Sequence, residues 1–452
     1  MTATRKDRAP GKGRAPEKDR APGKGQAPEK DPAPRKGRGR SRLRVALVSE
    51  HASPLAALGG ADAGGQNVHV ARLAETLADR GHRVTVYTRR DSPDLPERLP
   101  LRHGVDVHHV PAGPPEPVPK DELLPYMGLF GAFLSAQWAA ERPDVVHSHF
   151  WMSGLATLQA AQERALPFLH TYHALGTVKK RHQGDADTSP GERIPCERAV
   201  GAACDRIIAT CRDEVSELAA MRVTADRVSV VPCGVDPDVF TPTGPLWPRP
   251  ARRPLLVQVG RLVPRKGAAL SIAALARVPG AELVIAGGPA GPALDRDPEA
   301  VRLRGIAREL GVADRVHLAG GLDRAEVPRL MRAADAVLCP ADYEPFGIVP
   351  LEAMSCGTPV VATAVGGHRD TVAHRGTGLL VPPHDADALA QAVRTLLATP
   401  ARGRAYGAAG RRRVLSRYSW TRVVAQTEEV YRRVLAAHAA PAAHRTAVPA
   451  AP

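Results

Sequence analysis

Residues 342–352 read Asp-Tyr-Glu-Pro-Phe-Gly-Ile-Val-Pro-Leu-Glu, and this stretch predicts a loop that runs into a helix. Gly347 favours an irregular turn after Glu344, and Pro350 suits the first turn of a helix, because its missing N–H needs no partner there. Glu352 then falls near the helix start. Free amides at such a start attract a phosphate, while carboxylates accept hydrogen bonds from sugar hydroxyls. The stretch is therefore predicted to bind a ligand that offers both groups.

By themselves, two carboxylates more often mark an acidic loop and a helix cap than a binding site. Here the string continues through residues 353–363, Ala-Met-Ser-Cys-Gly-Thr-Pro-Val-Val-Ala-Thr, to Gly366 and Gly367. Together these residues closely resemble the EPFG-x3-LEAMA-x-G-x-PVVA motif of the family 4 retaining glycosyltransferases, whose paired glutamates have the same spacing. The resemblance extends from about Leu43 to Tyr431, far beyond a single glycine motif. It implies the GT-B fold, an α/β architecture in which two doubly wound Rossmann-like domains face a cleft.

Length and charge set the bounds for this interpretation. A chain of 452 residues with 43% apolar side chains is long enough for two domains with proper cores. The formal charge of +15 is concentrated at one end, since residues 1–42 hold 14 Lys and Arg against 5 Asp and Glu, a net +9. The near-hexamers of this segment, such as Arg-Ala-Pro-Gly-Lys-Gly at 8–13, lack large apolar side chains that could offset the entropy of ordering.

The segment 1–42 is therefore predicted to be a disordered basic tail. Weak contact with an anionic surface is the alternative to a purely solvated tail. A specific nucleic-acid partner is not expected, because the segment has no aromatic residues to stack on bases.

Cysteine usage and hydropathy indicate the compartment. The six cysteines show neither C-x-x-C pairs nor metal-site spacing, which favours free packed thiols in a reducing environment. No N-terminal apolar stretch resembles a signal peptide, and no run approaches the roughly 20 apolar residues that span a bilayer. We therefore expect a cytoplasmic protein without a transmembrane segment.

The first half of the chain begins with a β-α-β pattern. Residues 43–49 form a short apolar strand, a glycine-rich loop follows at 58–67, and a helical period starts near Val70. The loop is not a G-x-G-x-x-G, and no acidic residue ends the next strand, so a nicotinamide enzyme is not expected. Gly64 and Gly65 either let backbone amides approach a phosphate or sugar, or simply permit close helix packing.

Two later strands end in histidines. Residues 143–151, Pro-Asp-Val-Val-His-Ser-His-Phe-Trp, and 167–176, Pro-Phe-Leu-His-Thr-Tyr-His-Ala-Leu-Gly, each run from a strand into a loop, where open parallel sheets bind ligands. His147 and His149 share one face of their strand, but no third ligand stands nearby in sequence, so metal is the weaker reading. His173 matches the family's H-x-L-G loop, and the resemblance implies that it lies beside the transferred sugar.

The second half repeats the alternation of strands and helices. Residues 255–260 form a strand, and Arg261 and Lys266 follow it within one turn before a helix. Two fixed cations at a strand end suit a diphosphate better than they stabilise a fold. The string also resembles the family's G-R-x4-K-G motif. Because the alternation continues to residue 340, a second doubly wound sheet is predicted.

Composition shifts predict the domain organisation. Residues 241–254 hold five prolines and little periodicity, which is typical of a linker. The resemblance implies that the last helix crosses back onto the first domain. The predicted division is 1–42 basic tail, 43–240 N-terminal acceptor-side domain, 241–254 linker, 255–418 C-terminal nucleotide-sugar domain, 419–436 closing helix and 437–452 disordered tail.

The reaction implied by the resemblance is the transfer of a sugar from a nucleoside diphosphate, a UDP- or GDP-sugar, to a hydroxyl acceptor with retention of configuration. Preorganised cations such as Arg261 and Lys266 contribute most where charge develops on the departing diphosphate. No metal and no cofactor is then required beyond the nucleotide sugar as co-substrate, so activity is expected to survive EDTA. No residue stands out as a covalent nucleophile, which leaves a front-face displacement as the working mechanism.

The predicted site residues form three groups, with no metal ligands. The resemblance implies that Glu344 contacts the transferred sugar and that Glu352 contacts the ribose. The catalytic group is His173, Arg261, Lys266 and Glu344. The donor-binding group is Gly64, Gly65, Gly260, Arg261, Lys266, Glu344, Phe346, Gly347, Ile348, Val349 and Glu352. The acceptor-binding group is Asp62, Gln66, Asn67, Lys120, Lys179 and Arg193.

The first half also resembles two branches of the family that handle a phosphorylated acceptor. Residues 53–56 and 62–68 resemble the inositol phosphate glycosyltransferases, while residues 173–176 resemble the sucrose-phosphate synthases. Phe150 and Ala174 depart from the inositol branch, because neither side chain can donate a hydrogen bond. We therefore expect a phosphorylated polyol or sugar acceptor, with inositol phosphate as one candidate, held by Lys120, Lys179 and Arg193.

Three other functions stay open at the level of sequence. A sugar-nucleotide epimerase of the same fold would convert the donor with no acceptor present. A non-catalytic sugar-nucleotide sensor would bind the donor without turnover. A nucleic-acid binder would lose affinity steeply with salt and with removal of residues 1–42.

Overall fold

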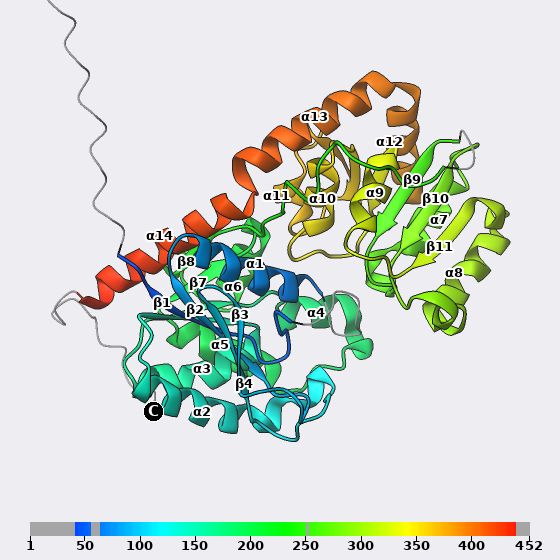
Figure 1. Ribbon diagram of the computed structural model, residues 1–452. Coiled ribbons are helices and arrows are strands. Elements are labelled where there is room, and N and C mark those ends of the chain that lie inside the picture. Colours follow the sequence, from blue (N-terminus) through cyan, green and yellow to red (C-terminus); the bar gives the residue numbers. More distant parts are fainter. Residues whose placement is uncertain (1–40, 56–63, 250–252, 440–452) are drawn as a thin grey trace, which may run out of the picture. The chain divides into compact units, whose positions relative to one another are not determined.

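The computed structural model describes residues 41–55, 64–249 and 253–439. Within these ranges the chain forms two β-sheets with helices on their faces (Figure 1). This confirms the predicted architecture of two doubly wound α/β units. Residues 1–40 of the predicted basic tail, the predicted C-terminal tail from residue 440 and the candidate acceptor residue Asp62 lie outside the described residues.

The first sheet has eight strands in the order β3-β4-β2-β1-β5-β6-β7-β8. All neighbours are parallel except β3 and β4, an antiparallel edge hairpin that the sequence reasoning did not predict. The strands are β1 (Arg44–Val48), β2 (Arg83–Arg89), β3 (Arg98–Arg102), β4 (Val105–Val110), β5 (Val145–His149), β6 (Phe168–Thr171), β7 (Arg206–Ala209) and β8 (Val228–Val230).

Helices cover both faces of this sheet because successive side chains of a strand point to opposite sides. In β1, Ala46 and Val48 pack with α2, α3 and their neighbours, whereas Val45 and Leu47 pack with α1 and α14. The helices are α1 (Gly65–Asp79), α2 (Met127–Ala140), α3 (Trp151–Glu163), α4 (Gly176–Gln183), α5 (Arg193–Ala203), α6 (Arg212–Ala220) and α14 (Trp420–Ala439), with short 3-10 turns η1 (Lys120–Glu122), η2 (Leu124–Tyr126), η3 (Gly184–Ala186) and η4 (Ala225–Arg227).

The second sheet has six parallel strands in the order β11-β10-β9-β12-β13-β14. Helices α7, α8 and α12 contribute to the core on one face, and α9, α10 and α13 to the core on the other. The strands are β9 (Leu255–Val259), β10 (Glu282–Ala286), β11 (Val316–Gly320), β12 (Ala336–Cys339), β13 (Val360–Thr363) and β14 (Gly378–Val381). The helices are α7 (Ala268–Leu275), α8 (Pro298–Glu309), α9 (Glu326–Ala333), α10 (Ile348–Ser355), α11 (His368–Thr371), α12 (Ala386–Ala398) and α13 (Pro400–Arg417), with η5 (Pro264–Lys266), η6 (Gly291–Arg296) and η7 (Ala313–Arg315).

The last helix follows the second sheet in sequence but packs on the first. Trp420, Tyr431 and their apolar neighbours on α14 belong to the same core as β1 and α1. At the start of α14, a side chain on Gly234 would place its Cβ 2.5 Å from the Trp420 ring, so only glycine allows this close approach. The helix thereby ties the end of the chain to the first sheet.

No helix in the described part of the chain is long and apolar enough to cross a membrane.

Candidate functional site

The predicted donor loop lies between β12 and α10, as the sequence pattern indicates. Gly347 stands at the start of α10 with φ 72°, a left-handed conformation that favours glycine, and a Cβ there would lie 2.9 Å from Thr371 Oγ1. The eight-residue helix then begins at Ile348, so that the first amides of α10 and its positive end stand beside the loop. This geometry suits an anionic ligand.

Glu344 and Lys266 form an ion pair at the end of the second sheet. Lys266 Nζ lies 2.5 Å from Glu344 Oε2, and the two side chains are 19% and 11% exposed. Burial alone would raise the pKa of Glu344, but Lys266, with His368 and Arg265, outweighs burial and lowers it to about 2. The carboxylate is therefore charged at neutral pH and able to accept hydrogen bonds.

A second connection ties the cationic turn to the donor loop. The guanidinium of Arg265 lies over the Tyr343 ring at 5.2 Å, and the Arg265 carbonyl accepts a hydrogen bond from the Asp342 amide at 2.9 Å. Arg265 Nη1 is buried with no hydrogen-bond partner among the described residues. Sequence reasoning did not single out this arginine, although it stands between the two cations that were predicted.

Arg261 lies two residues after the end of β9 and is exposed, and Gly260 between them has φ 153°. The two cations of the predicted motif thus leave one strand end together, with Lys266 turned toward Glu344.

Glu352 lies on α10, where its surroundings favour the neutral acid. Burial raises the pKa of Glu352 to about 8, and Arg324 opposes the change. A pocket with a volume of about 360 Å³ lies near this arginine. It is lined by Asn67, Arg72 and Glu75 of α1 together with Asp323 and Arg324. One wall of the pocket is therefore formed by Asn67, a predicted acceptor residue, and another by Arg324, the arginine that opposes the rise in the pKa of Glu352.

The paired histidine strands place two imidazoles side by side. His149 ends β5, His173 follows β6, and their Nδ1 and Nε2 atoms lie 2.9 Å apart. Burial lowers the pKa of both rings well below the usual histidine value, so both are neutral at pH 7. His173 also faces the donor loop, because its ring lies 5.3 Å from that of Phe346.

The glycine-rich turn meets the same loop. A Cβ on Gly65 would lie 3.2 Å from Ile348 Cδ1 and 3.7 Å from Phe346 Cδ2, whereas one on Gly64 would meet nothing within 4 Å. The structure thus brings Gly65, His173, Phe346 and Ile348 together.

Gln66 and Asn67, two of the predicted acceptor residues, make hydrogen bonds within the protein. The Gln66 amide donates to Ser49 Oγ at 3.1 Å and to the His149 carbonyl at 3.3 Å. The Asn67 side chain accepts from the Gly64 amide at 3.0 Å and donates to the Ser53 carbonyl at 3.1 Å. Both side chains are buried and hold the turn in place.

Two of the three predicted acceptor cations, Lys120 and Arg193, lie beside Phe150, and Lys179 shares a hydrogen-bond partner with Arg193. Lys120 Nζ and Arg193 Cζ lie 5.9 Å and 5.2 Å from the centre of the Phe150 ring. Ser189 Oγ accepts hydrogen bonds from Lys179 at 2.9 Å and from Arg193 at 3.1 Å. Phe150 itself has φ 78°, a conformation that is strained for a bulky residue and typical of functional sites.

Arg193 and Lys179 form ion pairs within the protein. Arg193, 3% exposed, contacts Glu197 at 2.9 Å and donates to the Ala174 carbonyl at 2.7 Å. Lys179 lies on α4 and pairs with Asp187 at 2.9 Å. Burial would raise the pKa of Asp187, but Lys179 and Ser189 outweigh it and lower it to about 2.

Two buried acids of this region were missed in the sequence. Glu197 stands four residues after Arg193 on α5, a spacing that signals an ion pair on a helix and could have identified it. Glu50 lies two residues after the end of β1, is 1% exposed, and contacts Ser153 Oγ and His51 Nδ1. A charged residue just past a buried strand was the available signal for Glu50.

No group of three or more His, Cys, Asp and Glu side chains in the described ranges is arranged to hold a metal ion.

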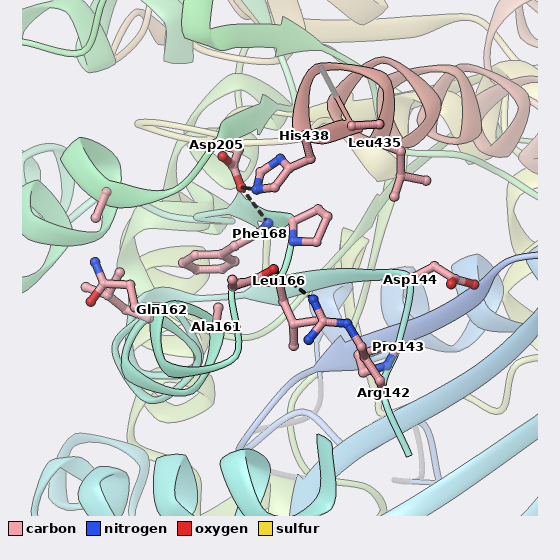
Figure 2. Close-up of a pocket in the computed structure, with 15 residues that line it drawn as sticks. Arg142, Pro143, Asp144, Ala161, Gln162, Leu166, Phe168, Asp205, Leu435 and His438 are labelled. Carbon is pink, nitrogen blue, oxygen red and sulfur yellow. Dashed lines mark hydrogen bonds and ion pairs between the residues drawn. The ribbon is translucent and has the colours of Figure 1, made fainter. Parts of the chain in front are cut away.

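A larger pocket lies at the other end of the first sheet (Figure 2). Its volume is about 520 Å³, and it lies beside the beginnings of β5 and β6 and the last turn of α14. The two aspartates that line it accept hydrogen bonds from backbone amides: Asp144 from Arg44 at 2.7 Å, and Asp205 from Phe168 at 2.8 Å. Arg142 donates to the carbonyls of Arg164 and Ala165. None of the predicted site residues lines this pocket.

Comparison with known proteins gives a glycosyltransferase family model on each half of the chain. The family model described as "Glycosyl transferases group 1" matches residues 247–413, and that described as "Glycosyltransferase Family 4" matches residues 63–239. D-inositol 3-phosphate glycosyltransferase from Stackebrandtia nassauensis is 38% identical over 90% of this chain and 96% of its own length. The protein of the same name from Kineococcus radiotolerans is 40% identical, over 89% and 98%.

Among solved structures, sucrose-phosphate synthase from Thermosynechococcus elongatus has a TM-score of 0.81 at 35% identity. The match covers 88% of this chain and all of that one, and therefore spans both sheets.

Proposed function

The chain belongs to the group 1 and family 4 glycosyltransferases, and on that premise we propose that it moves a sugar from a nucleoside diphosphate to a hydroxyl of a phosphorylated polyol or sugar, with retention of configuration. The Lys266–Glu344 pair beside the start of α10 carries this proposal. Lys266 offers a cation for the diphosphate, and Glu344, in direct contact with it, offers a charged carboxylate for the sugar. Donors with different nucleosides differ only in the base, so a comparison of their turnover identifies the base that the site accepts.

In the proposed mechanism, Arg261 and Lys266 stabilise the charge that develops on the leaving diphosphate. Glu344 orients the transferred sugar through its hydroxyls, and His173 lies at the other side of the same loop, against Phe346. We propose a front-face displacement that needs no metal ion. The bond between the anomeric carbon and the diphosphate breaks, the acceptor oxygen bonds the anomeric carbon on the same face, and the hydroxyl proton passes to the departing phosphate oxygen.

The acceptor proposal rests on two independent supports. The relatives named above act, by their names, on inositol 3-phosphate or form sucrose phosphate, so a phosphorylated sugar or polyol is common to both. In this chain, Lys120 and Arg193 lie beside Phe150, and Lys179 and Arg193 both donate to Ser189 Oγ. A phosphate placed there would share the Lys179 and Arg193 cations with Asp187 and Glu197.

The test of the reaction is direct. Purified protein is incubated with UDP-, GDP- and ADP-sugars, with and without inositol phosphate or hexose phosphates, in the presence of EDTA. We expect a product heavier by one glycosyl unit, release of the nucleoside diphosphate and an unchanged anomeric configuration by NMR. Donor conversion without acceptor would identify an epimerase, and saturable binding without turnover a sensor. Loss of activity with EDTA that magnesium restores would contradict the metal-free mechanism.

The phosphate pocket is tested best at Lys120, because Arg193 is buried in structural contacts. In Lys120→Met, KM for a phosphorylated acceptor should rise about tenfold or more, while KM for the matched unphosphorylated acceptor changes little, since a charge-assisted hydrogen bond contributes roughly 1.5–3 kcal/mol. Lys180→Met, at an exposed lysine of α4, is the matched control. An equal rise in KM for both acceptors would show that Lys120 does not bind the acceptor phosphate.

The raised pKa of Glu352 predicts that nucleotide binding releases a proton. The pKa of about 8 leaves the carboxyl mostly protonated at pH 7 in the free protein. Ribose hydroxyls that donate to the carboxylate stabilise its charged form and lower that pKa, so binding at pH 7 should release up to about one proton. Calorimetry in two buffers of different ionisation enthalpy measures this release, and Glu352→Gln should reduce it. Identical proton release by both proteins would mean that Glu352 does not contact the nucleotide.

A further inference from the structure

The paired histidines at the ends of β5 and β6 share one proton between them. The 2.9 Å contact between His149 Nδ1 and His173 Nε2 requires a hydrogen on only one of the two atoms, because both rings are neutral. The remaining nitrogens, His149 Nε2 and His173 Nδ1, are buried and have no hydrogen-bond partner among the described residues. Unpartnered buried polar atoms of this kind need an explanation, and a bound ligand is one.

The position of the proton between the two rings determines whether the other nitrogen of each ring carries a hydrogen. If His173 Nε2 donates, the proton on His173 is used in that bond and its Nδ1 is a bare acceptor. If His149 Nδ1 donates instead, His173 must carry its proton on Nδ1 and becomes a donor. The first arrangement places both rings in the Nε2–H form, which neutral histidine favours in water. His149 therefore decides whether His173 offers an acceptor or a donor.

The backbone holds His173 in place for this task. His173 has φ 62°, and the Ala174 amide donates to the Tyr172 carbonyl at 2.7 Å across it. A three-residue turn with a positive central φ is rare and strained, and such strain persists where the surroundings determine the conformation. The ring is 4% exposed and lies against Phe346 of the donor loop. Its free nitrogen is thus fixed near the predicted position of the sugar.

We propose that His149 is a positioning residue that sets the tautomer of His173, so that His173 Nδ1 accepts a hydrogen bond from a hydroxyl of the bound sugar. The role for the sugar rests on the proposed function, whereas the tautomer of the free protein does not.

The tautomer is measured by 15N NMR of protein labelled at histidine, with His173 resonances assigned from a His173→Asn sample. We expect Nε2 protonated and Nδ1 bare in the free protein, and a shift of the Nδ1 resonance on adding a sugar nucleotide. His149→Phe should weaken this preference, because it leaves the Nε2–H of His173 without an acceptor. His149→Asn should keep it, since the amide oxygen can accept from Nε2–H.

His170 supplies the matched control. It is a fully buried histidine on β6 whose Nδ1 bonds Ser148 Oγ at 2.7 Å, and it takes no part in the hydrogen bond between His149 and His173. His170→Phe removes an equally buried imidazole but leaves the bond between His149 and His173 in place, so the tautomer of His173 should be unchanged. It also measures how much of any loss in activity comes from general destabilisation.

Turnover gives the second readout. His149→Phe should lower kcat by roughly tenfold to a hundredfold, the cost of one unmade buried hydrogen bond, with UDP affinity nearly unchanged and most activity restored in His149→Asn. A proton on His173 Nδ1 in the free wild type, or an unchanged His173 spectrum in His149→Phe, would overturn the proposal. If the wild type turns over no sugar nucleotide, the proposed function fails, but the spectra still test the pair.

Discussion

In the Lys266→Ala variant, kcat/KM is expected to fall by about a hundredfold to a thousandfold while the fold persists, because a preorganised charge is lost at the leaving diphosphate. The loss has a second component in this protein. Glu344 owes its pKa of about 2 chiefly to Lys266, so without the lysine that pKa rises and the buried carboxylate loses its partner. The variant therefore weakens both the cation and the anion of the site.

A double variant separates the two components. If Lys266 served only to neutralise Glu344, Lys266→Ala/Glu344→Gln would recover activity relative to Lys266→Ala. If both side chains contact the donor, the double variant is at least as inactive as either single one. Arg302→Ala, which removes an exposed arginine paired with Glu299 on α8, is the control and should leave kcat/KM unchanged. Wild-type kinetics in Lys266→Ala would disprove the assignment of the site.

The pH dependence of stability follows the same pair. Because the folded-state pKa of Glu344 is depressed to about 2, its contribution to stability is present above the ordinary glutamate pKa of 4.5 and is lost as the pH falls toward 2. In Lys266→Ala this acid-sensitive contribution should shrink, so the difference in stability between wild type and variant narrows at low pH.

The second large effect is on stability, at Arg193. Arg193→Met should lower the free energy of unfolding by about 3–5 kcal/mol, because it leaves Glu197 buried without its cation. Arg193→Met/Glu197→Gln should be more stable than Arg193→Met, since glutamine is neutral and its oxygen can still accept from the Gly176 amide, which now bonds Glu197 at 2.9 Å. Urea denaturation measures both values.

This expectation changes how Arg193 can be used as a probe of the acceptor. A weaker acceptor affinity in Arg193→Ala would not by itself identify a phosphate contact, because the same change releases Ala174 and Ser189 beside Phe150. If Arg193→Met is as stable as the wild type, the ion pair with Glu197 is not structural, and Arg193 returns as a direct phosphate ligand.

Local patterns in the sequence were sufficient for most elements. The apolar runs that end at Val48, His149 and Thr171, and the stretch from Pro345 to Glu352, form the strands and the helix expected. Each depends on side chains that are neighbours in sequence, such as an apolar period or a proline at a helix start. The β3-β4 hairpin was missed because Arg98–Arg102 is an edge strand that is half exposed and carries charge, so its pattern resembles a loop.

The sequence by itself determined the two sheets, the glycines at the turns and the residues at the strand ends, because these follow from local sterics and from the edge at which parallel strands meet. Only the tertiary structure decided which side chains of the site contact one another. Lys266 and Glu344 are 78 positions apart, and His149 and His173 are 24 apart, so no spacing rule relates them. Arg193 looked like a free cation in sequence, but folding buried it, and a buried charge must find a counterion.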